Sequence, residues 1–460
     1  MATFHTIRTS DFEFHNRIDA ELYQPHLKKS YTELLMSGFE LRKLSMVCII
    51  RSGTTPPDRI DGLDCGPILF KTTDVRNSIL SPNAKYYHIS PEIHRRMRKT
   101  SIVRQDILLN IVGATLDVIG RSAFVGELPE EGNITQAMVL LRLKNGEILP
   151  GFLFAFLGTY FGQDQVKRFA RPTGQYNLNL QEVGHIVIPV LPKESQRSIE
   201  ELIFKASRSL IASENGYRGA KELLESELAL HKLTFRRPIG YTAQFSDLEL
   251  SRRSDAQHYQ PQFAALLKHL DGFPTAKLRA IKTLNRRGVQ PIYVNEGPIP
   301  IVNSQHLGPR HISYDTLERT SKALFYAAPV AHILRDDLLI YTTGAYIGRT
   351  NVYLSDSPAL ASNHVNILRL QPEIDAAYMG LVMQSLIGQL QTQKHARGSA
   401  QAELYPSDID KFVVPLLPPD TQRAIGDLLR ESLSKQLESK RLLVEAKTRV
   451  EQLIEEAAKS

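Results

Sequence analysis

The sequence predicts a mixed α/β (α+β) chain of two tandem globular domains, each followed by a long helix, with the two helices paired as an antiparallel coiled coil of pseudo-two-fold symmetry. Two observations lead to this prediction. The stretch PVLPKESQRSIEELI at residue 189 returns as PLLPPDTQRAIGDLL at residue 415, and each copy opens a run of helical apolar spacing. A self-match of this length indicates a duplicated structural unit.

The match extends over nearly the whole chain and keeps its order. Its paired segments are 19–25 with 255–261, 66–68 with 297–299, 71–74 with 302–305, 106–109 with 337–339, residue 133 with residue 363, 141–143 with 368–370, and 162–163 with 388–389. The offset falls from 236 at the first pair to 226 at the last, as small insertions in loops would produce. The two copies therefore share a scaffold and differ mainly in polar, turn-rich segments, where surface loops carry recognition.

The repeat divides the chain into six segments. These are an N-terminal segment 1–45, a first globular domain 46–192, a central helix 193–236, a linking segment 237–280 that repeats 1–45, a second globular domain 281–418, and a C-terminal helix 419–460. Short β-like runs at 78–90, 137–143 and 185–191 are separated by Gly, Pro and Asn. One helical stretch, 153–169 with its counterpart 378–394, interrupts them, and this mixture indicates an α/β or α+β domain.

The prolines of the repeated stretch end each globular domain, because Pro189 and Pro192 can neither continue a central strand nor lie inside a helix. The C-terminal helix then carries an apolar seam at spacings of three and four, formed by Leu443, Ala446, Val450, Leu453 and Ala457. The central helix has a similar seam, and its Gly216 and Gly219 indicate a local bend or a close helix approach. The two seams would bury each other as an antiparallel pair. The alternative is that each helix packs only on its own domain.

The composition is that of an ordinary globular protein, with 42% hydrophobic and 23% charged residues in 460. The first residues lack the apolar run of a signal peptide and no stretch reaches the length of a membrane span, which favours a cytoplasmic protein. The formal net charge of +7 modestly favours a polyanionic partner. Cys48 and Cys65 stand alone without a Cys/His spacing pattern, so neither a disulfide framework nor a metal site is expected.

Motifs for catalysis are missing from the sequence. It contains no Gly-rich phosphate loop, no GxGxxG, no HExxH and no GxSxG, and no motif by which amino-methyltransferases hold a target base. His88 and His311, both in the tripeptide His-Ile-Ser, are interpreted as structural residues. Paired carboxylates such as those at 130–131 lie in turns and are interpreted as solvated loop charges. A non-catalytic recognition protein without a cofactor of its own is predicted.

Several basic and polar segments are candidates for contacts with DNA. The most basic is 93–105, with five formal positive charges and no acid, which would neutralise phosphates; a solvated helix face is the equal alternative. Arg, Asn, Gln, Ser and Thr at strand ends are the residue types that contact base edges and phosphates. The candidates in the first domain are Arg51, Ser52, Thr54, Lys71, Thr72, Thr73, Arg95, Arg96, Arg98, Lys99, Arg121, Arg171, Thr173, Tyr176 and Asn177. Those in the second domain are Arg286, Arg287, Asn303, Ser304, Gln305, Arg349, Arg397, Ser399 and Gln401.

A pattern of residues resembles the specificity (S) subunit of type I restriction-modification systems. Each of two variable domains closes with P-x-x-P-x-x-x-Q-R-x-I before a long helix, and each contains Asp-Ile-Leu-Leu or Asp-Leu-Leu followed by Gly-Ala and Gly-Arg. The resemblance covers the chain from about residue 17 onward. It implies two target-recognition domains that each read one half of a split DNA sequence, with the helices setting the gap.

The resemblance also implies partners. These are double-stranded DNA and two copies of a DNA adenine methyltransferase subunit, which would bind the S-adenosylmethionine, with room for a motor-nuclease restriction subunit, in a complex for DNA methylation and phage defence. The segment Asp-Ala-x-x-Tyr-Gln-Pro before each domain and the two helix-interior glycines depart from the commonest family pattern and leave the gap length open. The alternative function is a protein-interaction scaffold of a related phage-defence complex, without sequence-specific DNA reading. Salt-sensitive binding to a subset of DNA sequences separates the two.

Overall fold

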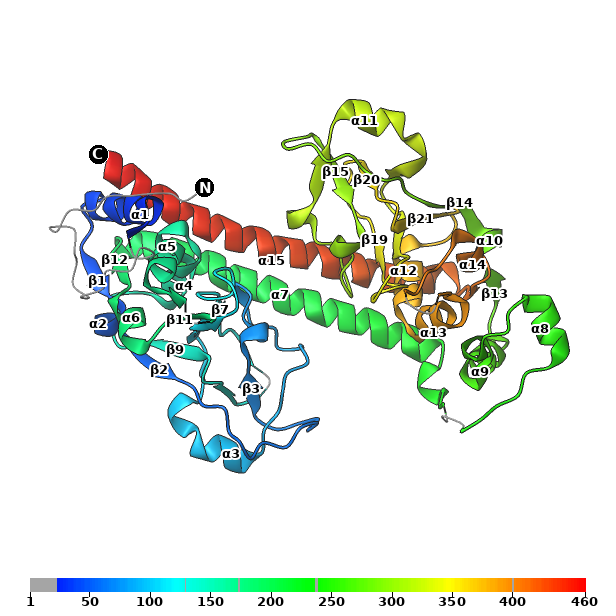
Figure 1. Cartoon of the computed structure of the whole chain (residues 1–460), viewed down its shortest axis with the longest axis horizontal. Coiled ribbons are helices and arrows are strands. Elements are labelled where there is room, and N and C mark those ends of the chain that lie inside the picture. The colour runs from blue at the N-terminus through cyan, green and yellow to red at the C-terminus, as the bar shows by residue number, and fades with distance from the viewer. Residues whose placement is uncertain (1–22, 129, 173, 236–238, 399–400) are drawn as a thin grey trace. The chain divides into compact units, whose positions relative to one another are not determined.

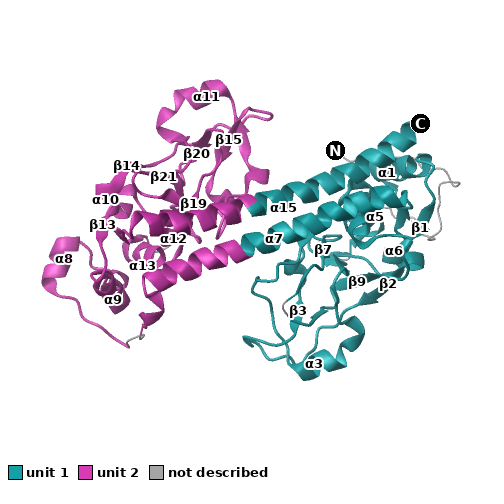
Figure 2. Ribbon diagram, turned by 180° about the vertical axis from the view of Figure 1, so that it is seen from behind, with its two compact units in different colours: residues 1–214, 435–460 teal, residues 215–434 magenta. Residues whose placement is uncertain are grey.

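The computed structural model describes residues 23–128, 130–172, 174–235, 239–398 and 401–460 (Figure 1). Its internal contacts separate two compact units, which Figure 2 draws in different colours. Unit 1 contains residues up to 214 together with 435–460, and unit 2 contains residues 215–434. Within the described residues, no helix combines the length and the apolar character needed to cross a bilayer.

Unit 1 alternates short strands with short helices. Its strands are β1 (Leu41–Lys43), β2 (Cys48–Ser52), β3 (Ile68–Phe70), β4 (Ser78–Ile79), β5 (Ile107–Asn110), β6 (Val112–Gly113), β7 (Ser122–Phe124), β8 (Gly132–Ile134), β9 (Met138–Leu143), β10 (Arg171–Pro172), β11 (Tyr176–Asn177) and β12 (Val187–Pro189). Its helices are α1 (Pro25–Met36), α2 (Leu44–Val47), α3 (Pro91–Arg96), α4 (Pro150–Gly158), α5 (Tyr160–Phe169) and α6 (Leu180–His185), with the 3-10 turns η3 (Thr72–Asp74) and η4 (Arg98–Thr100). Helix α7 (Lys193–Glu227) begins in unit 1 and ends in unit 2.

A five-stranded sheet in the order β2-β9-β5-β7-β4 forms the centre of unit 1. Alternate residues of a strand point to opposite faces. Ile107 and Leu109 accordingly enter a core with α4, whereas Leu108 enters a second core with β3 and β8. Burial on both faces explains why these strands are continuous apolar runs in the sequence.

Unit 2 repeats this plan. Its strands are β13 (Thr275–Lys277), β14 (Lys282–Arg287), β15 (Ile299–Val302), β16 (Glu318–Thr320), β17 (His332–Ile333), β18 (Leu338–Tyr341), β19 (Thr350–Val352), β20 (Ala359–Ala361), β21 (Val365–Leu370) and β22 (Val413–Pro415). Its helices are α8 (Phe245–Ser251), α9 (Pro261–Leu270), α10 (Leu278–Ile281), α11 (Lys322–Ala327), α12 (Ala376–Gln384), α13 (Leu386–His395) and α14 (Pro406–Ile409), and α15 (Pro419–Lys459) begins here and ends in unit 1. The sheets β14-β21-β18-β19 and β16-β15-β20-β17 correspond to the two β layers of unit 1.

A buried ion pair recurs in both units and explains two of the repeated segments. Arg142 donates two hydrogen bonds to Asp106, at 2.8 and 2.7 Å, and Arg369 donates two to Asp337, at 2.7 and 2.8 Å. The two carboxylates are 1% and 0% exposed. Each pair ties strand β9 or β21 to the residue before β5 or β18, so the same residues are needed in both copies.

The Gln of each repeated Gln-Arg pair is a second shared device. Gln196 is fully buried, accepts a hydrogen bond from the Leu149 N–H at 2.9 Å, and donates to the carbonyls of Leu191 at 2.8 Å and Glu147 at 3.1 Å. Gln422 repeats this with the Asp375 N–H and the Leu417 carbonyl. The Gln side chain, in the first turn of the long helix, therefore binds that helix to the proline-rich exit of the globular domain before it.

Substituting Gln196→Leu is expected to lower the free energy of unfolding of unit 1 by about 2–4 kcal/mol, because three backbone groups lose their buried partner while the volume is kept. Arg197→Leu, at the next position of the same helix but exposed, is the matched control and should change stability little. Chemical denaturation followed by hydrogen exchange of unit 1 amides measures both. Equal effects of the two substitutions would contradict the role given to Gln196.

Three predicted matches of the repeat are wrong in register. Phe70 pairs with Ile134 and Val302 with Ala361, and the glycine turns at Gly53 and Gly288 contact those same two partners, which makes Phe70 equivalent to Val302. Ile68 is therefore equivalent to Pro300 and not to Ile299. The segment 71–74 therefore corresponds to 303–306 and not to 302–305, and Asn133 corresponds to Leu360 and not to Asn363. Small insertions in these loops moved the similar residues away from equivalent positions in the strands.

The helical stretches predicted at 153–169 and 378–394 are each two helices. Thr159 and Ser385 have extended backbones that end one helix, and their hydroxyls accept hydrogen bonds from the first turn of the next. A Cβ on Gly162 would lie 2.5 Å from the Phe156 carbonyl oxygen, so this tight corner requires glycine. The apolar periodicity continues across the corner, which is why the sequence pattern did not reveal it.

Helix α7 is uninterrupted through both of its glycines. A Cβ on Gly216 would lie 3.3 Å from the Cβ of Ser432 on α15, which confirms the close helix approach at Gly216, whereas a Cβ on Gly219 would meet no atom within 4 Å. The helix ends at Glu227 and not at the predicted residue 236, because Ala229 adopts a left-handed conformation with φ 46° and ψ 38°.

Each unit contains one antiparallel pairing of α7 with α15. In unit 1 the start of α7 and the end of α15 share one core, through Ile199, Ile203 and Ala206 on α7 and Leu442, Ala446, Val450 and Ile454 on α15. In unit 2 the end of α7 and the start of α15 share another, through Ala220, Leu224, Leu228, Ile425 and Leu429. The predicted antiparallel pairing is thereby confirmed, and the alternative that each helix packs only on its own domain is wrong.

The buried face of α15 in unit 1 differs from the predicted seam. Leu442 and Ile454 are fully or nearly fully buried, whereas Leu443 and Leu453 are only partly buried, as is Ala457. The helix packs on the globular domain as well as on α7, so its buried stripe is wider than a coiled-coil seam.

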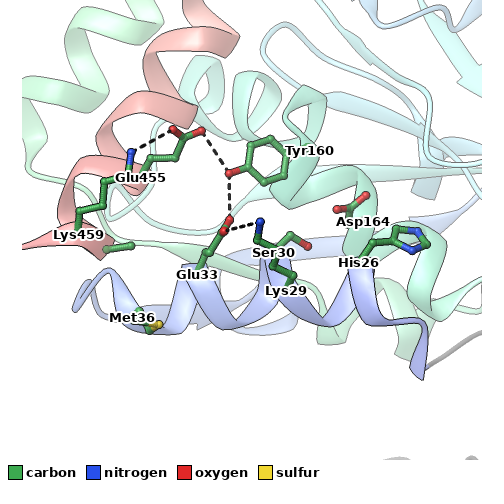
Figure 3. Close-up of a pocket in the computed structure, with 10 residues that line it drawn as sticks. His26, Lys29, Ser30, Glu33, Met36, Tyr160, Asp164, Glu455 and Lys459 are labelled. Atoms are coloured by element: carbon green, nitrogen blue, oxygen red, sulfur yellow. Dashed lines mark hydrogen bonds and ion pairs between the residues drawn. The ribbon is translucent and has the colours of Figure 1, made fainter. Parts of the chain in front are cut away.

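Polar contacts also hold the end of α15 in unit 1 (Figure 3). The Tyr160 hydroxyl lies 3.3 Å from a carboxylate oxygen of Glu33 on α1 and 3.3 Å from one of Glu455 on α15. The Tyr160 N–H donates to Glu451 at 3.1 Å. These contacts join α1, α5 and α15 within unit 1, so they are interpreted as structural. None of the residues belongs to the predicted DNA-contacting set.

Candidate nucleic-acid interface

The basic segment 93–105 folds as a short helix and a 3-10 turn on the surface of unit 1. Ser90 caps α3 by accepting a hydrogen bond from the Ile93 N–H, and Ile93 and Met97 anchor the segment in a small core with Leu69. This anchoring leaves Arg95, Arg98 and Lys99 exposed, and among the described residues none of the three side chains has a hydrogen bond or an ion pair. Arg96 instead forms an ion pair with Asp58.

Arg51, at the end of β2, joins this segment. Its Nη1 donates to the carbonyl of Lys99 at 2.6 Å. Arg51, Arg95, Arg98 and Lys99 are hereafter called the basic edge. Of the predicted residues, these four are brought together, and three of them are available for phosphates.

The turn after Arg51 requires glycine in both units. A Cβ on Gly53 would lie 2.0 Å from the Ile134 carbonyl oxygen, and one on Gly288 would lie 2.1 Å from that of Ala361. This equivalence aligns Arg51 with Arg286 and Ser52 with Arg287. Thr54 follows the turn, exposed, and its N–H donates to Ile134 at 3.1 Å.

The 3-10 turn after β3 holds the next candidates. Lys71 places its ammonium 3.7 Å from the centre of the Tyr87 ring, while Thr72 is half-buried and Thr73 is exposed. In unit 2 the equivalent turn η7 (Ser304–His306) follows Asn303. The side-chain amides of Asn303 and Gln305 donate to the two oxygens of Glu318, at 2.8 and 2.9 Å, so they are already engaged, with Ser304 half-buried between them.

The two Gly-containing hairpins are held by ion pairs. Arg171 donates to Glu182 at 2.5 Å, and Arg397 donates two hydrogen bonds to Asp408 at 3.1 and 2.7 Å. Burial alone would raise the pKa of Asp408, but the hydrogen bonds from Arg397 and Lys411 outweigh it and hold the pKa below its usual value. These arginines are therefore framework residues as well as candidates.

The remaining predicted residues lie as follows. Tyr176 and Asn177 are half-buried in β11, and Gln401 is exposed in the second hairpin, while Thr173 and Ser399 lie outside the described residues. Arg286 is exposed on β14. Arg121 donates to the Asp117 carbonyl at 2.6 Å, and Arg349 stacks 3.6 Å from the centre of the Tyr346 ring.

Two residues beside the second hairpin were not predicted. Glu403 accepts a hydrogen bond from Arg287 at 2.7 Å, and the Tyr405 hydroxyl donates to the same carboxylate. The residue types expected to contact DNA did not include a carboxylate. The alignment of Glu403 with Asn177 in the repeat was the available signal.

Comparisons with known proteins give structural similarities only. No protein-family model matches the sequence, and no curated protein matches it either. A solved S subunit of a type I restriction-modification system from M. genitalium matches with 12% identity over 91% of this chain and 96% of that chain, at a TM-score of 0.49. The chain is similar to type I S subunits.

Two further solved structures are also similar over most of the chain. The HsdS subunit from Thermoanaerobacter tengcongensis matches with 15% identity over 91% of this chain and 97% of that chain, at a TM-score of 0.29. A chain from a structure of complex assembly and conformational transition in a type I system matches with 16% identity over 92% and 97%, at a TM-score of 0.30. Because all three TM-scores are below 0.5, the functional proposal rests on this chain's own residues and contacts.

Proposed function

We propose that the chain is the non-catalytic DNA sequence-specificity subunit of a type I restriction-modification complex, in which each unit reads one half of a bipartite DNA target. One observation supports this above the others. The two units keep the same internal ion pair and the same buried Gln, yet carry different polar residues at equivalent loop positions, such as Lys71 against Asn303. A common framework with divergent polar loops suits the reading of two different sequences.

The basic edge would supply phosphate contacts for unit 1. Its three unpaired cations lie on an anchored segment, so their side chains alone need to be ordered on binding. Each phosphate neutralised releases counterions and makes binding salt-dependent. The exposed Arg286 and the half-buried Arg349 of unit 2 would add contacts of the same kind.

The long helices would serve as the spacer and as the docking surface for partners. Both α7 and α15 have residues in each unit, as expected of elements that set the gap between two half-sites. In this proposal two copies of an adenine methyltransferase subunit bind the duplicated scaffold and carry the S-adenosylmethionine. A restriction subunit would join the same complex in phage defence.

The test uses the chain assembled with its cognate methyltransferase subunits. The complex is expected to bind and methylate DNA containing one interrupted sequence motif, with affinity that falls as salt rises. The triple variant R95Q/R98Q/K99Q should reduce the slope of log K against log salt by up to about 2.7, at about 0.9 per phosphate contact. Arg96→Gln, on the same segment but paired with Asp58, is the matched control and should change the slope less.

The scaffold hypothesis predicts a different result. If the chain only joins proteins, the assembled complex shows no preference among DNA sequences, and deletion of the gene removes no interrupted motif from the methylation map of its host. An unchanged salt slope in the triple variant, with sequence preference retained, would reject the basic edge but not the specificity function.

A further inference from the structure

The hairpins of the two units end on residues of different chemistry at the same position. Asn177 pairs with Arg171 across the first hairpin, and Glu403 pairs with Arg397 across the second. Each then contacts the next strand at equivalent residues, Val112 in unit 1 and Thr343 in unit 2. The two units thus share the same backbone pairing at this position, but unit 1 carries an amide where unit 2 carries a carboxylate.

Glu403 is held in one orientation while remaining accessible. Arg287 donates to one carboxylate oxygen at 2.7 Å and the Tyr405 hydroxyl donates to the other, and 31% of the side chain is exposed. The hydrogen bonds from Tyr405 and Arg287 lower the pKa of Glu403, so it is ionised at neutral pH. Each oxygen retains a lone pair, and the carboxylate lines a polar hollow with Arg397, Gln401 and Ser407.

The support behind Glu403 is polar only in unit 2. Asn366 lies opposite Arg287 on the neighbouring strand, is fully buried, and donates to Asn285 at 2.7 Å. The equivalent residues of unit 1 are Val139 and Ile50. Among the described residues, the Asn366 Oδ1 and the Arg287 Nε have no hydrogen-bond partner, and such buried polar atoms lower stability. Unit 2 therefore has a polar pair, Asn366 and Asn285, behind Arg287 where unit 1 has the apolar pair Val139 and Ile50.

We propose that Glu403 is a specificity-determining residue that accepts a hydrogen bond from the exocyclic amino group of cytosine in the major groove of the unit 2 half-site. This inference rests on the proposed function. A carboxylate only accepts hydrogen bonds, so it is repelled by the acceptor edges of guanine and by O4 of thymine, and N7 disfavours adenine. Asn177, which both donates and accepts, would select a different base in the other half-site, and Arg287 and Tyr405 are positioning residues for Glu403.

The experiment measures base preference at every position of both half-sites, by methylation mapping and by selection from randomised DNA, with the assembled complex. Glu403→Gln is expected to lower the preference for cytosine at one position of the unit 2 half-site by roughly tenfold or more. The unit 1 half-site should keep its preferences. Asp356→Asn removes a charge from an 88%-exposed carboxylate of the same unit and is the matched control, which should leave all positions unchanged.

Tyr405→Phe is a second variant that tests the same inference if Glu403→Gln fails to fold. It keeps the carboxylate and removes one hydrogen bond, so it should weaken the preference at the same single position by a smaller factor. If both variants weaken binding to all sequences equally, or if preferences stay as in the wild type, Glu403 only holds Arg287 and the inference is wrong. A wild-type complex without any base preference would instead overturn the proposed function, and the inference with it.

Discussion

Replacing Val450 with aspartate is expected to detach the end of α15 from unit 1 and to lower that unit's free energy of unfolding by about 4 kcal/mol or more. The reason is twofold, since a valine loses its burial and a carboxyl group enters an apolar core. Val450 is fully buried against the start of α7. Hydrogen exchange of the β5 and β9 amides measures the effect inside unit 1.

Val444→Asp provides the matched control, because Val444 lies on the same helix with 64% of its surface exposed. The two substitutions share the same change in charge and helix propensity, so the difference between them isolates burial. We expect Val444→Asp to leave exchange in unit 1 nearly unchanged. Equal exchange in the two variants would show that the last helix does not belong to the core of unit 1.

The second large effect is expected from Arg142→Leu. This substitution leaves the Asp106 carboxylate, which is 1% exposed, without its ion-pair partner, and removal of one member of a buried pair costs about 3–5 kcal/mol. Because 33% of the Arg142 side chain reaches solvent, we expect a value at the lower end, about 3 kcal/mol. Unit-resolved hydrogen exchange should place the loss in unit 1.

Arg369→Leu should have the same effect in unit 2, where it leaves Asp337 without its ion-pair partner. The double variant D106L/R142L should recover most of the lost stability, because an apolar pair of similar volume often replaces a buried ion pair without loss. If the double variant is no more stable than Arg142→Leu, the carboxylate has another function in the fold. In that case the Val103 N–H, which donates to Asp106 at 2.7 Å, is the first contact to examine.

Much of the framework was predictable because repeated residues perform repeated structural tasks. Gln196 and Asp106 each bind backbone or charge in a geometry that both units share, so their types recur at recognisable spacing. The helix corner at Thr159 was not predictable, because a side-chain cap turns the chain without breaking the apolar periodicity. The end of α7 was missed for a similar reason, since the left-handed residue there is an alanine.

The candidate interface was predictable in its basic residues but not in its contacts. Charge in the segment 93–105 pointed to Arg95 and Lys99, but only the fold separates them from Arg96, which is neutralised by Asp58. Asn303 and Gln305 belong to the residue types that contact bases, but each donates a hydrogen bond to Glu318, 13 or more residues further along the chain. Long-range partners of this kind leave no local pattern in a single sequence.

Unit 1 combines residues from both ends of the chain, so it can be completed only late in synthesis. Its core needs Val450 and Ile454, which the ribosome adds about 260 residues after the start of α7 at Lys193. At synthesis rates of about 5–20 residues per second, that delay is roughly 10 to 50 seconds. During this interval Ile199 and Ile203 lack the α15 residues that complete their core, so we expect the nascent first half to be prone to aggregation until synthesis is nearly finished.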